Sequence, residues 1–406
     1  MYIDGKYDIV FFWKQNDTGI YGRRQDMLIK YLAKSPKINQ VVHFDAPIGI
    51  FDLLALINLS KDRKTNQSNL IFFQTLSRIL GLKNSGRVKY YTFVKVSRLT
   101  RLFSPRSNAY MDFITRVLSR NKVGQRRTIF FVCPKNFDFP EIVKTFEPQF
   151  VVCDVIDDHR AWYDKDDPYV ERLTQNYRDI IRLSDLVIVN CEKLRESMLN
   201  FADEVCLIPN ACEIPIDEEF KCKKPEEFKK IKGHIIGYVG NLSSRIDIDL
   251  LKYVVTNRPD WNLILIGSAH LSKDIVKLTA YDNVYFLGVK PYHKVRKYIS
   301  SFDVAIIPHL KNKLTRSMNP LKLFVYCSMN VPVVSTEIDG IDELREAIYV
   351  ARDKKDFIEK IEVALKTGRT GSFGKEYRDL LRKNSWPCRV DRILSLVEKH
   401  WPNGRL

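Results

Sequence analysis

Short apolar runs alternate with amphipathic segments along most of the chain. The first run, YDIVFFW at residues 7–13, has the length of a buried strand, and a polar turn separates it from an amphipathic segment at residues 23–33. Apolar strands that alternate with helices predict a mostly parallel sheet covered on both faces. Further runs of strand length lie at residues 41–45, 88–96, 128–134, 150–156, 186–190 and 204–210.

A second series of the same kind begins after residue 233. The segment between the two series, residues 214–233, is charged and lacks aliphatic periodicity, which is typical of a linker. We therefore predict an α/β protein of two doubly wound, Rossmann-like domains, residues 1–213 and 234–383, that face each other across a cleft. The apolar runs of the second series lie at residues 234–240, 262–268, 283–288, 304–308, 331–336 and 347–351.

Composition supports two folded domains in a reducing compartment. The chain has 406 residues, which is long for one core, and its 45% apolar and 12% aromatic residues exclude general disorder. We find neither a secretory signal nor a run of about 18 apolar residues that could span a membrane. The eight cysteines form no CxxC pair. We therefore expect a cytoplasmic protein with reduced thiols.

The net charge of +17 is concentrated in one part of the chain. Between Lys61 and Arg127 there are sixteen Lys and Arg but only two acids, a net charge of +14. All of this basic segment except Arg127 falls in residues 46–126, which we interpret as an insertion in the first domain. Interleaved apolar groups such as LLALINL favour an anionic membrane surface as its partner. Nucleic acid, without an accompanying motif, and a solvated surface that aids solubility are the alternatives.

Two stretches of the second domain have the character of an anion site. Gly240 directly follows an apolar run, and Arg245 comes five residues later. Ligands of doubly wound sheets bind beyond the carboxyl ends of the strands, so Arg245 could reach a phosphate there. A glycine that only makes a structural turn is the alternative.

The second stretch is the polar loop with Arg316, Ser317 and Asn319, followed by a helix that opens at Pro320. Helix N-termini present unpaired N–H groups and a partial positive charge, and Lys322 adds a full charge. The two stretches together predict a phosphate or pyrophosphate site. An ordinary crossover helix with a solvated lysine is the alternative.

In the first domain, Asp157, Asp158 and His159 follow the apolar run at residues 150–156. A carboxylate at a strand end could act as a general base toward a hydroxyl, especially where a neighbouring acid raises its pKa. Paired acids also bind divalent ions or cap the next helix, and both alternatives stay open here.

Glycines and arginines follow the first apolar run. Gly19, Arg23 and Arg24 lie in GIYGRRQ, residues 19–25, and suit an anionic or sugar ligand. A solvated helix start is the alternative.

These motifs together resemble bacterial glycosyltransferases of the GT-B fold, in particular group 1 relatives and glucuronosyltransferase-like enzymes of polysaccharide assembly. The resemblance is strongest over residues 235–336, in IGYVGNLSSRIDIDLL, PDWNLILIGS and NPLKLFVYCSMNVPVVST. FVVCDVIDD and IPNACE match weaker motifs of the first domain. NSWPCRVDRIL matches the family's last helix, so residues 384–406 are expected to return to the first domain. Only residues 46–126 fall outside the resemblance.

The resemblance implies transfer of a hexose-like sugar from a nucleotide diphosphate, with UDP expected, to an acceptor hydroxyl. It implies no metal or other cofactor, because cations and a helix dipole can stabilise the leaving diphosphate. The partners would be a nucleotide sugar, a lipid-linked or polysaccharide acceptor and an anionic membrane surface at the inner membrane face, without nucleic acid. The implied donor residues are Gly240, Asn241, Arg245, Arg316, Ser317, Asn319, Leu321 and Lys322; the acceptor residues are Gly19, Arg23, Arg24 and His159; the base is Asp157 or Asp158.

The chain departs from the family pattern in the helix after Pro320. The family usually has glutamates at the positions of Ser317 and Val325, the second of which reaches the donor ribose, and a glycine at Asn330. Valine cannot bond a ribose hydroxyl. Another group takes this role, the donor differs, or the chain is an inactive scaffold in an assembly complex.

Overall fold

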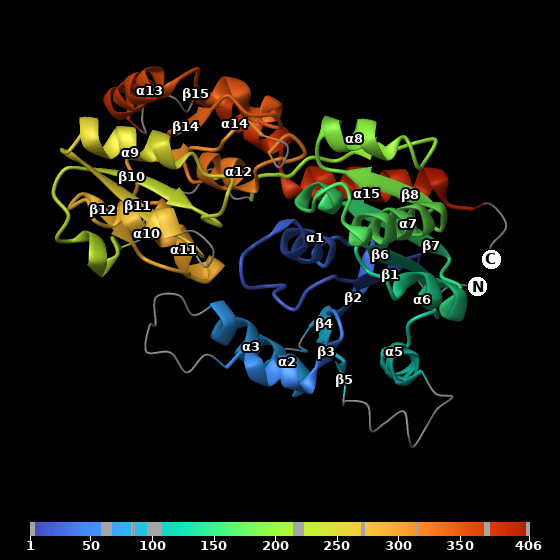
Figure 1. Ribbon diagram of the computed structural model, residues 1–406. Coiled ribbons are helices and arrows are strands. Elements are labelled where there is room, and N and C mark those ends of the chain that lie inside the picture. The colour runs from blue at the N-terminus through green and yellow to red at the C-terminus, as the bar shows by residue number, and fades with distance from the viewer. Residues whose placement is uncertain are drawn as a thin grey trace. The chain divides into compact units, whose positions relative to one another are not determined.

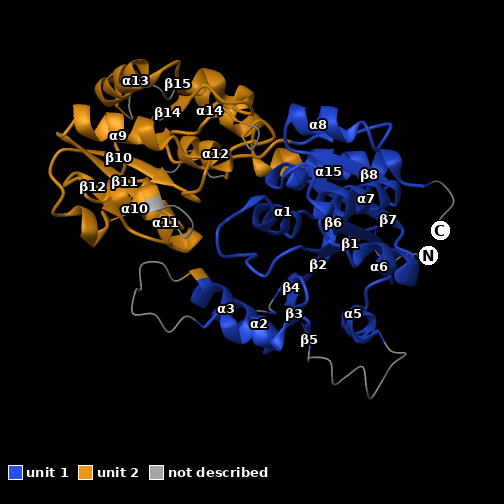
Figure 2. Cartoon of the chain, viewed as in Figure 1, with its two compact units in different colours: residues 1–59, 68–208, 390–406 blue, residues 60–67, 209–389 orange. Residues whose placement is uncertain are grey.

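The computed structural model describes residues 5–57, 67–82, 84, 86–95, 108–213, 223–268, 273–312, 315–368 and 374–402. The chain divides into two compact units, shown in Figure 2. Unit 1 comprises residues 1–59, 68–208 and 390–406, and unit 2 comprises residues 60–67 and 209–389. Each unit has its own parallel sheet, which confirms the predicted α/β fold class.

Unit 1 is built on a seven-stranded sheet of order β4-β2-β1-β6-β7-β8-β9, in which the described pairings are all parallel (Figure 1). The chain winds outward in both directions from β1 and β6, so these strands form the switch point where doubly wound sheets bind ligands. The strands are β1 (Tyr7–Phe12), β2 (Ile38–Phe44), β4 (Val88–Tyr91), β6 (Arg127–Val132), β7 (Phe150–Val155), β8 (Leu186–Val189) and β9 (Cys206–Leu207).

Helices cover both faces of this sheet, because its central strands are apolar on both sides. Val10 and Phe12 of β1 pack into one core cluster, while Ile9 and Phe11 are buried on the other face. The helices of unit 1 are α1 (Arg24–Leu32), α2 (Ile50–Ala55), α3 (Gln67–Ile79), α5 (Ala109–Arg120), α6 (Phe139–Phe146), α7 (Pro168–Arg182) and α8 (Glu192–Met198), with the 3-10 helix η2 (His159–Trp162).

The described part of the basic segment contributes to the core of unit 1. Strand β4 forms an edge of the main sheet, and Ile114 of α5 is fully buried. The run at residues 88–96, predicted as one strand, is interrupted after β4, and the separate strand β5 (Val94–Lys95) pairs with β3 (Ile48–Gly49). The side chain of Thr92 donates a hydrogen bond to Asp45, which fixes the chain at this interruption.

Unit 2 contains a six-stranded parallel sheet of order β12-β11-β10-β13-β14-β15. Its switch point lies between β10 and β13. The elements are β10 (His234–Val239), α9 (Ile248–Asn257), β11 (Trp261–Ile266), α10 (Lys273–Leu278), β12 (Val284–Phe286), α11 (Tyr292–Ile299), β13 (Val304–Ile307), α12 (Leu321–Ser328), β14 (Val333–Thr336), η4 (Asp342–Ala347), β15 (Tyr349–Ala351), α13 (Lys354–Thr367) and α14 (Lys375–Lys383).

The predicted linker is packed against unit 2 where the structure describes it. The 3-10 helix η3 (Glu226–Phe228) buries Phe228 completely, in the same cluster as Phe302. Unit 2 begins at residue 209, a few residues before the predicted boundary at 213. Residues 214–222 lie outside the described part of the chain.

The last helix, α15 (Trp386–His400), begins in unit 2 and continues in unit 1 from Val390. Beyond it, the ring of Trp401 stacks on Phe150 of β7, with ring centroids 5.4 Å apart. Trp401 is therefore packed on the sheet of unit 1.

In the described residues, no helix has both the length and the apolar character that a membrane span requires. The seven described cysteines are all free thiols, and five of them are buried.

Candidate functional site

The turns after β10 and β11 pack backbone against backbone. Gly240 has a φ of +149° and Gly267 a φ of +147°. A side chain at Gly267 would place its Cβ 1.7 Å from the carbonyl oxygen of Gly240. The Gly240 N–H donates to the Ile266 carbonyl over 2.9 Å. Glycine is required here by both conformation and space.

Lys322 lies directly beside the turn at Gly240. Its Nζ donates to Nε2 of His309 over 3.1 Å and lies 4.8 Å from the centre of the Tyr238 ring. A Cβ at Gly240 would be 3.0 Å from the Lys322 Cε, so the glycine leaves room for the lysine. Lys322 is the second residue of α12, so its charge sits in the helix's first turn.

Tyr326 fixes α12 against the end of β10. Its buried hydroxyl accepts a hydrogen bond from the Val239 N–H over 2.8 Å and donates to the Val239 carbonyl over 3.3 Å. Because Tyr326 lies one turn beyond Lys322, these bonds hold the lysine at the strand end.

Asn319 fixes the loop before α12. Its Oδ1 accepts from the Asn210 N–H over 2.8 Å, and its Nδ2 donates to the Gly340 carbonyl over 2.9 Å and to Glu343 over 3.3 Å. Gly340, at a φ of +74°, would bring a Cβ within 2.0 Å of the Met318 carbonyl oxygen. The Asn319 amide is thus engaged within unit 2 and positions the start of α12.

Arg245 lies on the same rim of the sheet. The Leu310 N–H donates to the Arg245 carbonyl over 2.8 Å, and the Asp247 N–H donates to the Pro308 carbonyl over 2.8 Å. These bonds join the turn after β10 to the end of β13, at the switch point. The structure thus brings together Gly240, Arg245 and Lys322.

Burial and neighbouring positive charges lower the pKa values of Lys322 and His309 in this cluster. Burial, with Arg245 nearby, lowers the pKa of Lys322 to about 7. Burial, with Lys322 and Arg245 nearby, holds the pKa of His309 well below its ordinary value. His309 is therefore neutral and accepts from Lys322 at Nε2, which places its ring proton on Nδ1. Nδ1 is buried and has no hydrogen-bond partner among the described residues.

Lys322 forms no ion pair with a carboxylate among the described residues. Its described partners are a neutral imidazole and an aromatic ring. A half-buried ammonium without a counter-ion, beside a helix N-terminus, is suited to an anionic ligand. We call Gly240, Arg245, His309 and Lys322 the cation site, because the protein's own cationic side chains lie there; its expected ligand is an anion.

The other predicted donor residues surround the cation site in sequence. Asn241 and Arg316 are exposed, and Ser317 and Leu321 are half-buried. Their contact with a donor stays a prediction.

The positions that depart from the family pattern have local explanations. Val325 packs against the core of unit 2. Asn330 adopts a φ of +60° directly after α12, a conformation that favours glycine but that asparagine tolerates better than most residues. Replacement of the family glycine by asparagine therefore keeps the helix end.

In unit 1, Asp158 is engaged within the fold. It caps η2 by accepting from the Arg160 N–H over 3.1 Å, and the Arg160 guanidinium pairs with both carboxylate oxygens at 2.8 and 2.9 Å. The capping alternative raised by the sequence therefore describes Asp158. Asp157 is half-buried, and its carbonyl accepts from the Tyr177 hydroxyl over 3.1 Å. The role of either acid as a base stays a prediction.

His159 joins two strand ends of unit 1. Its Nε2 is hydrogen-bonded to Lys14, directly beyond β1, and its Nδ1 contacts the Tyr177 hydroxyl at 2.8 Å. Burial, with Lys14 and Lys135 nearby, lowers the pKa of His159 to about 2. The neutral ring therefore accepts from Lys14 and donates to Tyr177. Lys14 and Tyr177 were missed by the sequence analysis.

The predicted acceptor arginines have different surroundings. Arg24 is buried and pairs with both oxygens of Asp154 at 3.0 Å. Arg23 is exposed and pairs with Asp17 at 2.6 Å. Gly19 has a φ of +86°, and its N–H donates to Asp26. These contacts hold the loop between β1 and α1, and contact with an acceptor stays a prediction.

Two further features bear on the choice of site. The described residues contain no group of three or more His, Cys, Asp and Glu side chains arranged to hold a metal.

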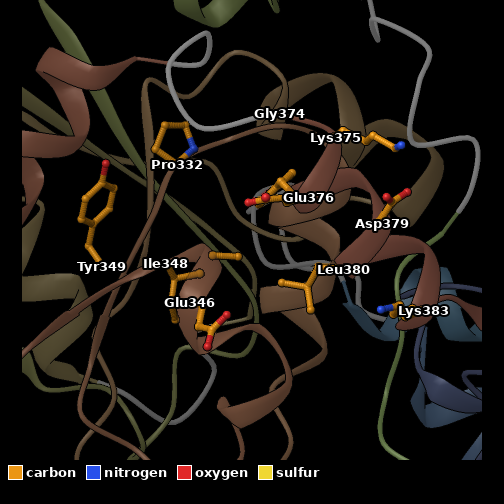
Figure 3. Close-up of a pocket in the computed structure, with 12 residues that line it drawn as sticks. Pro332, Glu346, Ile348, Tyr349, Gly374, Lys375, Glu376, Asp379, Leu380 and Lys383 are labelled. Carbon is orange, nitrogen blue, oxygen red and sulfur yellow. The ribbon is translucent and has the colours of Figure 1, made fainter.

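A hollow of about 810 Å³ lies in unit 2, between α14 and the amino ends of β14 and β15, with acidic and basic side chains on its wall (Figure 3). It is at the opposite ends of the strands from the cation site, and none of the predicted site residues lines it.

Part of the chain matches a known protein family. Residues 233–367 match the family described as glycosyl transferases group 1. TuaH of Bacillus subtilis (strain 168), assigned to teichuronic acid biosynthesis as a glycosyltransferase, is 24% identical over 177 residues. This alignment covers 42% of the present chain and 45% of TuaH, less than half of that relative's length.

Solved structures share the fold of the whole chain. Sucrose-phosphate synthase from Thermosynechococcus elongatus has a TM-score of 0.65 at 13% identity, covering 97% of this chain and 98% of its own. HepE from Anabaena, in complex with UDP and glucose, has a TM-score of 0.62 at 14% identity, with 96% and 99% covered. A structure from E. coli bound with UDP-2-fluoro glucose has a TM-score of 0.63 at 12% identity, with 97% and 99% covered.

Proposed function

We propose that this chain, a GT-B protein whose residues 233–367 match the group 1 glycosyl transferases, moves a sugar from a nucleotide diphosphate to an acceptor hydroxyl. The observation that carries the proposal is the cation site at the switch point of unit 2. There Lys322 is held beside a helix N-terminus and has no carboxylate partner among the described residues. A bound diphosphate would give this lysine a negatively charged partner.

The proposed chemistry is electrostatic. As the bond from the sugar to the diphosphate breaks, negative charge grows on the leaving phosphate oxygens. Lys322, Arg245 and the first turn of α12 are placed to stabilise that charge without reorganising, which lowers the barrier more than it strengthens donor binding. Transfer by this route requires no bound metal. UDP is the expected nucleotide, because two of the similar solved structures carry UDP or a UDP-sugar.

Unit 1 is the proposed acceptor unit. Of the two candidate bases, Asp157 suits the role better, because Arg160 occupies both oxygens of Asp158. His159 is held neutral and contributes orientation through Lys14 and Tyr177.

The acceptor class and location are also part of the proposal. We place the chain in synthesis of a cell-surface polysaccharide or glycolipid, on a lipid-linked or polysaccharide acceptor. TuaH, assigned to teichuronic acid biosynthesis, supports the class. The net charge of +14 between Lys61 and Arg127 supports peripheral attachment to anionic lipid on the cytoplasmic side of the inner membrane.

Thermal unfolding with a panel of nucleotide sugars tests the proposal. A ligand that binds only the folded state stabilises it, by about 2.7 kcal/mol at a concentration of 100 times its Kd. We expect UDP-sugars to raise the Tm and to be consumed when an acceptor extract is added. A panel without any stabilising nucleotide sugar would overturn the proposal.

The second candidate is an inactive scaffold of a polysaccharide assembly complex. It is favoured by Val325, whose packed aliphatic side chain stands where the family usually has a ribose-binding glutamate. Binding of UDP-sugars without any turnover, across acceptor extracts, would support this candidate over the enzyme.

A further inference from the structure

Exposed apolar side chains are concentrated on two helices of unit 1. Phe51 of α2 is 71% exposed and Phe73 of α3 is 66% exposed, and Leu80 and Leu82, just after α3, are 62% and 74% exposed. More than half of the exposed large apolar side chains in the described part of the chain lie in residues 50–82. Single exposed apolar residues are ordinary, but such a concentration marks a binding surface.

The most buried and the most exposed side chains of α3 are the reverse of those of an ordinary surface helix. Its two buried residues are Thr75 and Arg78, and its two exposed residues are Phe73 and Ile79, whereas the remaining residues, polar and apolar alike, are half-buried. A helix on the surface of a soluble domain buries its apolar side and exposes its polar side. The orientation of α3 is therefore costly in water and favourable against an apolar phase.

A buried ion pair holds α3 in this orientation. The Arg78 guanidinium donates to both oxygens of Asp45, beyond the carboxyl end of β2, at 2.5 and 2.7 Å. Both side chains are fully buried. Thr92, beyond β4, donates to the same carboxylate over 2.6 Å. A buried pair of this kind fixes one geometry, because moving either partner leaves an uncompensated charge.

The same helix contacts the loop between β1 and α1. The Gln74 side chain donates to the Thr18 carbonyl over 3.0 Å, and Arg78 donates to the same oxygen. At Gly19 an added Cβ would lie 3.2 Å from the Gln74 Nε2, so glycine allows the close approach of α3. Helix α3 is thus attached to the carboxyl ends of β1, β2 and β4, the rim where a doubly wound sheet binds its ligand.

The positive charge of this part of the chain favours anionic lipid as the partner that binds this surface. Apart from the buried Arg78, residues 61–127 contain fifteen Lys and Arg and two acids, a net charge of +13, and α3 itself has no acidic residue. A second copy of the chain would bring the same positive charge against it, whereas anionic lipid supplies both an apolar phase and negative charge.

We infer that α2, α3 and the turn after α3 insert Phe51, Leu54, Phe73 and Leu80 into an anionic lipid surface, with the ligand-binding rim of the unit 1 sheet held beside that surface by Arg78. The acceptor is then a glycan carried on a lipid, presented at the membrane surface. This second part rests on the proposed function. Figure 1 shows α2 and α3 at the same end of unit 1, away from α8.

Vesicle sedimentation with the full chain tests the inference. The probes are vesicles of phosphatidylcholine alone and of phosphatidylcholine with phosphatidylglycerol. The variant is Phe51→Ser with Phe73→Ser, and the matched control is Leu199→Ser with Val363→Ser, which are also exposed apolar residues but lie on α8's end and on α13. Thermal unfolding checks that both variants keep the fold.

We expect the wild type to bind vesicles that contain phosphatidylglycerol, and added salt to weaken the binding. The Phe51 and Phe73 variant should lose affinity by about tenfold or more, since a phenylalanine side chain gains this much on leaving water. The control variant should bind as the wild type does. Equal binding by the Phe51 and Phe73 variant, or no binding by the wild type, would overturn the inference.

Two further readouts separate this inference from its alternatives. Stabilisation by UDP should be the same in the wild type and in the Phe51 and Phe73 variant, so its absence in both would count against the proposed function alone. Sedimentation velocity without vesicles should show one mass for both proteins. A wild-type dimer that becomes a monomer in the variant would assign the surface to a second copy and overturn the membrane role.

Discussion

Two arginines at the strand ends of unit 1 and Lys322 at a strand end of unit 2 have different partners. In unit 1, the guanidiniums at the rim are neutralised within the fold: Arg24 pairs with Asp154, and Arg160 pairs with Asp158. In unit 2, Lys322 contacts a neutral histidine and a tyrosine ring, and no carboxylate pairs with it among the described residues.

The same architecture therefore serves two purposes. In an internal ion pair, the attraction between the two charges offsets the free-energy cost of removing them from water, and the pair holds the rim in one geometry. Burying the charge of a lysine that has no counter-ion costs free energy, which is why the pKa of Lys322 is lowered. A bound anion would offset this desolvation cost. The difference predicts that removing the charge of Arg24 affects stability, while removing the charge of Lys322 affects ligand binding.

The largest effect is expected for Arg24→Met. This change leaves Asp154 buried without its partner, so the free energy of unfolding should fall by about 3–5 kcal/mol. Chemical denaturation measures it. Lys37→Met, which breaks the exposed pair with Glu398, is the matched control and should cost about 1 kcal/mol or less. Similar small losses for both variants would remove the structural role of the buried pair.

The pKa of Lys322, about 7, predicts how UDP binding depends on pH. Only the protonated lysine attracts the diphosphate, so affinity should fall as pH rises above 7, by up to about tenfold for each pH unit. Calorimetric titration from pH 6 to 9 measures this. The Lys322→Met variant should lose this dependence, and a wild-type affinity that is flat across this range would contradict the account.

The same shift has a consequence for stability. Between pH 7 and 10 the unfolded chain keeps a proton on this lysine that the folded protein has released. The contribution of Lys322 to the free energy of unfolding therefore rises with pH in that window. The difference in stability between the wild type and Lys322→Met should change in the same direction.

The smallest effect is expected for Val325→Glu. Leu321 and Val325 lie on one face of α12, and the glutamate would restore the acid that the family usually has there. If the donor ribose lies against this face, a new hydrogen bond should raise UDP affinity by roughly threefold to tenfold. Val325→Leu keeps the apolar character and should leave affinity unchanged. No gain from the glutamate, with stability intact, would place the ribose elsewhere.

The elements of the fold were predictable, because buried parallel strands are nearly continuous apolar runs. The runs at 7–13, 150–156 and 234–240 became β1, β7 and β10 with only small changes at their ends. Position relative to a strand end was also informative. It selected Gly240, Arg245 and Lys322, which the structure brings to one rim.

The partners of the site residues were not predictable, because they depend on contacts between distant parts of the chain. The sequence around Asp158 does not show whether this residue acts as a general base or caps the next helix. Only the fold shows that Arg160 pairs with both of its carboxylate oxygens. The criterion that selected Gly240 also applies to His309, which follows β13, and to Lys14, which follows β1. Both were missed because no pattern of neighbouring residues marked them.

The basic segment was only partly understood from its composition. Counting charges treats Arg78 as part of a solvated surface, yet this side chain is fully buried against Asp45. That pair places the Arg78 side of α3 against the fold. Charge counts describe the sum over a segment, whereas burial of one member depends on a partner more than thirty residues away.

The central claim is that Lys322 recognises the diphosphate of a nucleotide sugar. Calorimetric titration of the wild type and Lys322→Met with UDP and with uridine tests it most directly, with Lys277→Met as a control at an exposed lysine of unit 2. We predict that Lys322→Met weakens UDP binding by about a hundredfold, the scale of a lost charge-assisted contact, and leaves uridine binding and Lys277→Met unaffected. UDP binding of equal strength in the wild type and Lys322→Met would contradict the account.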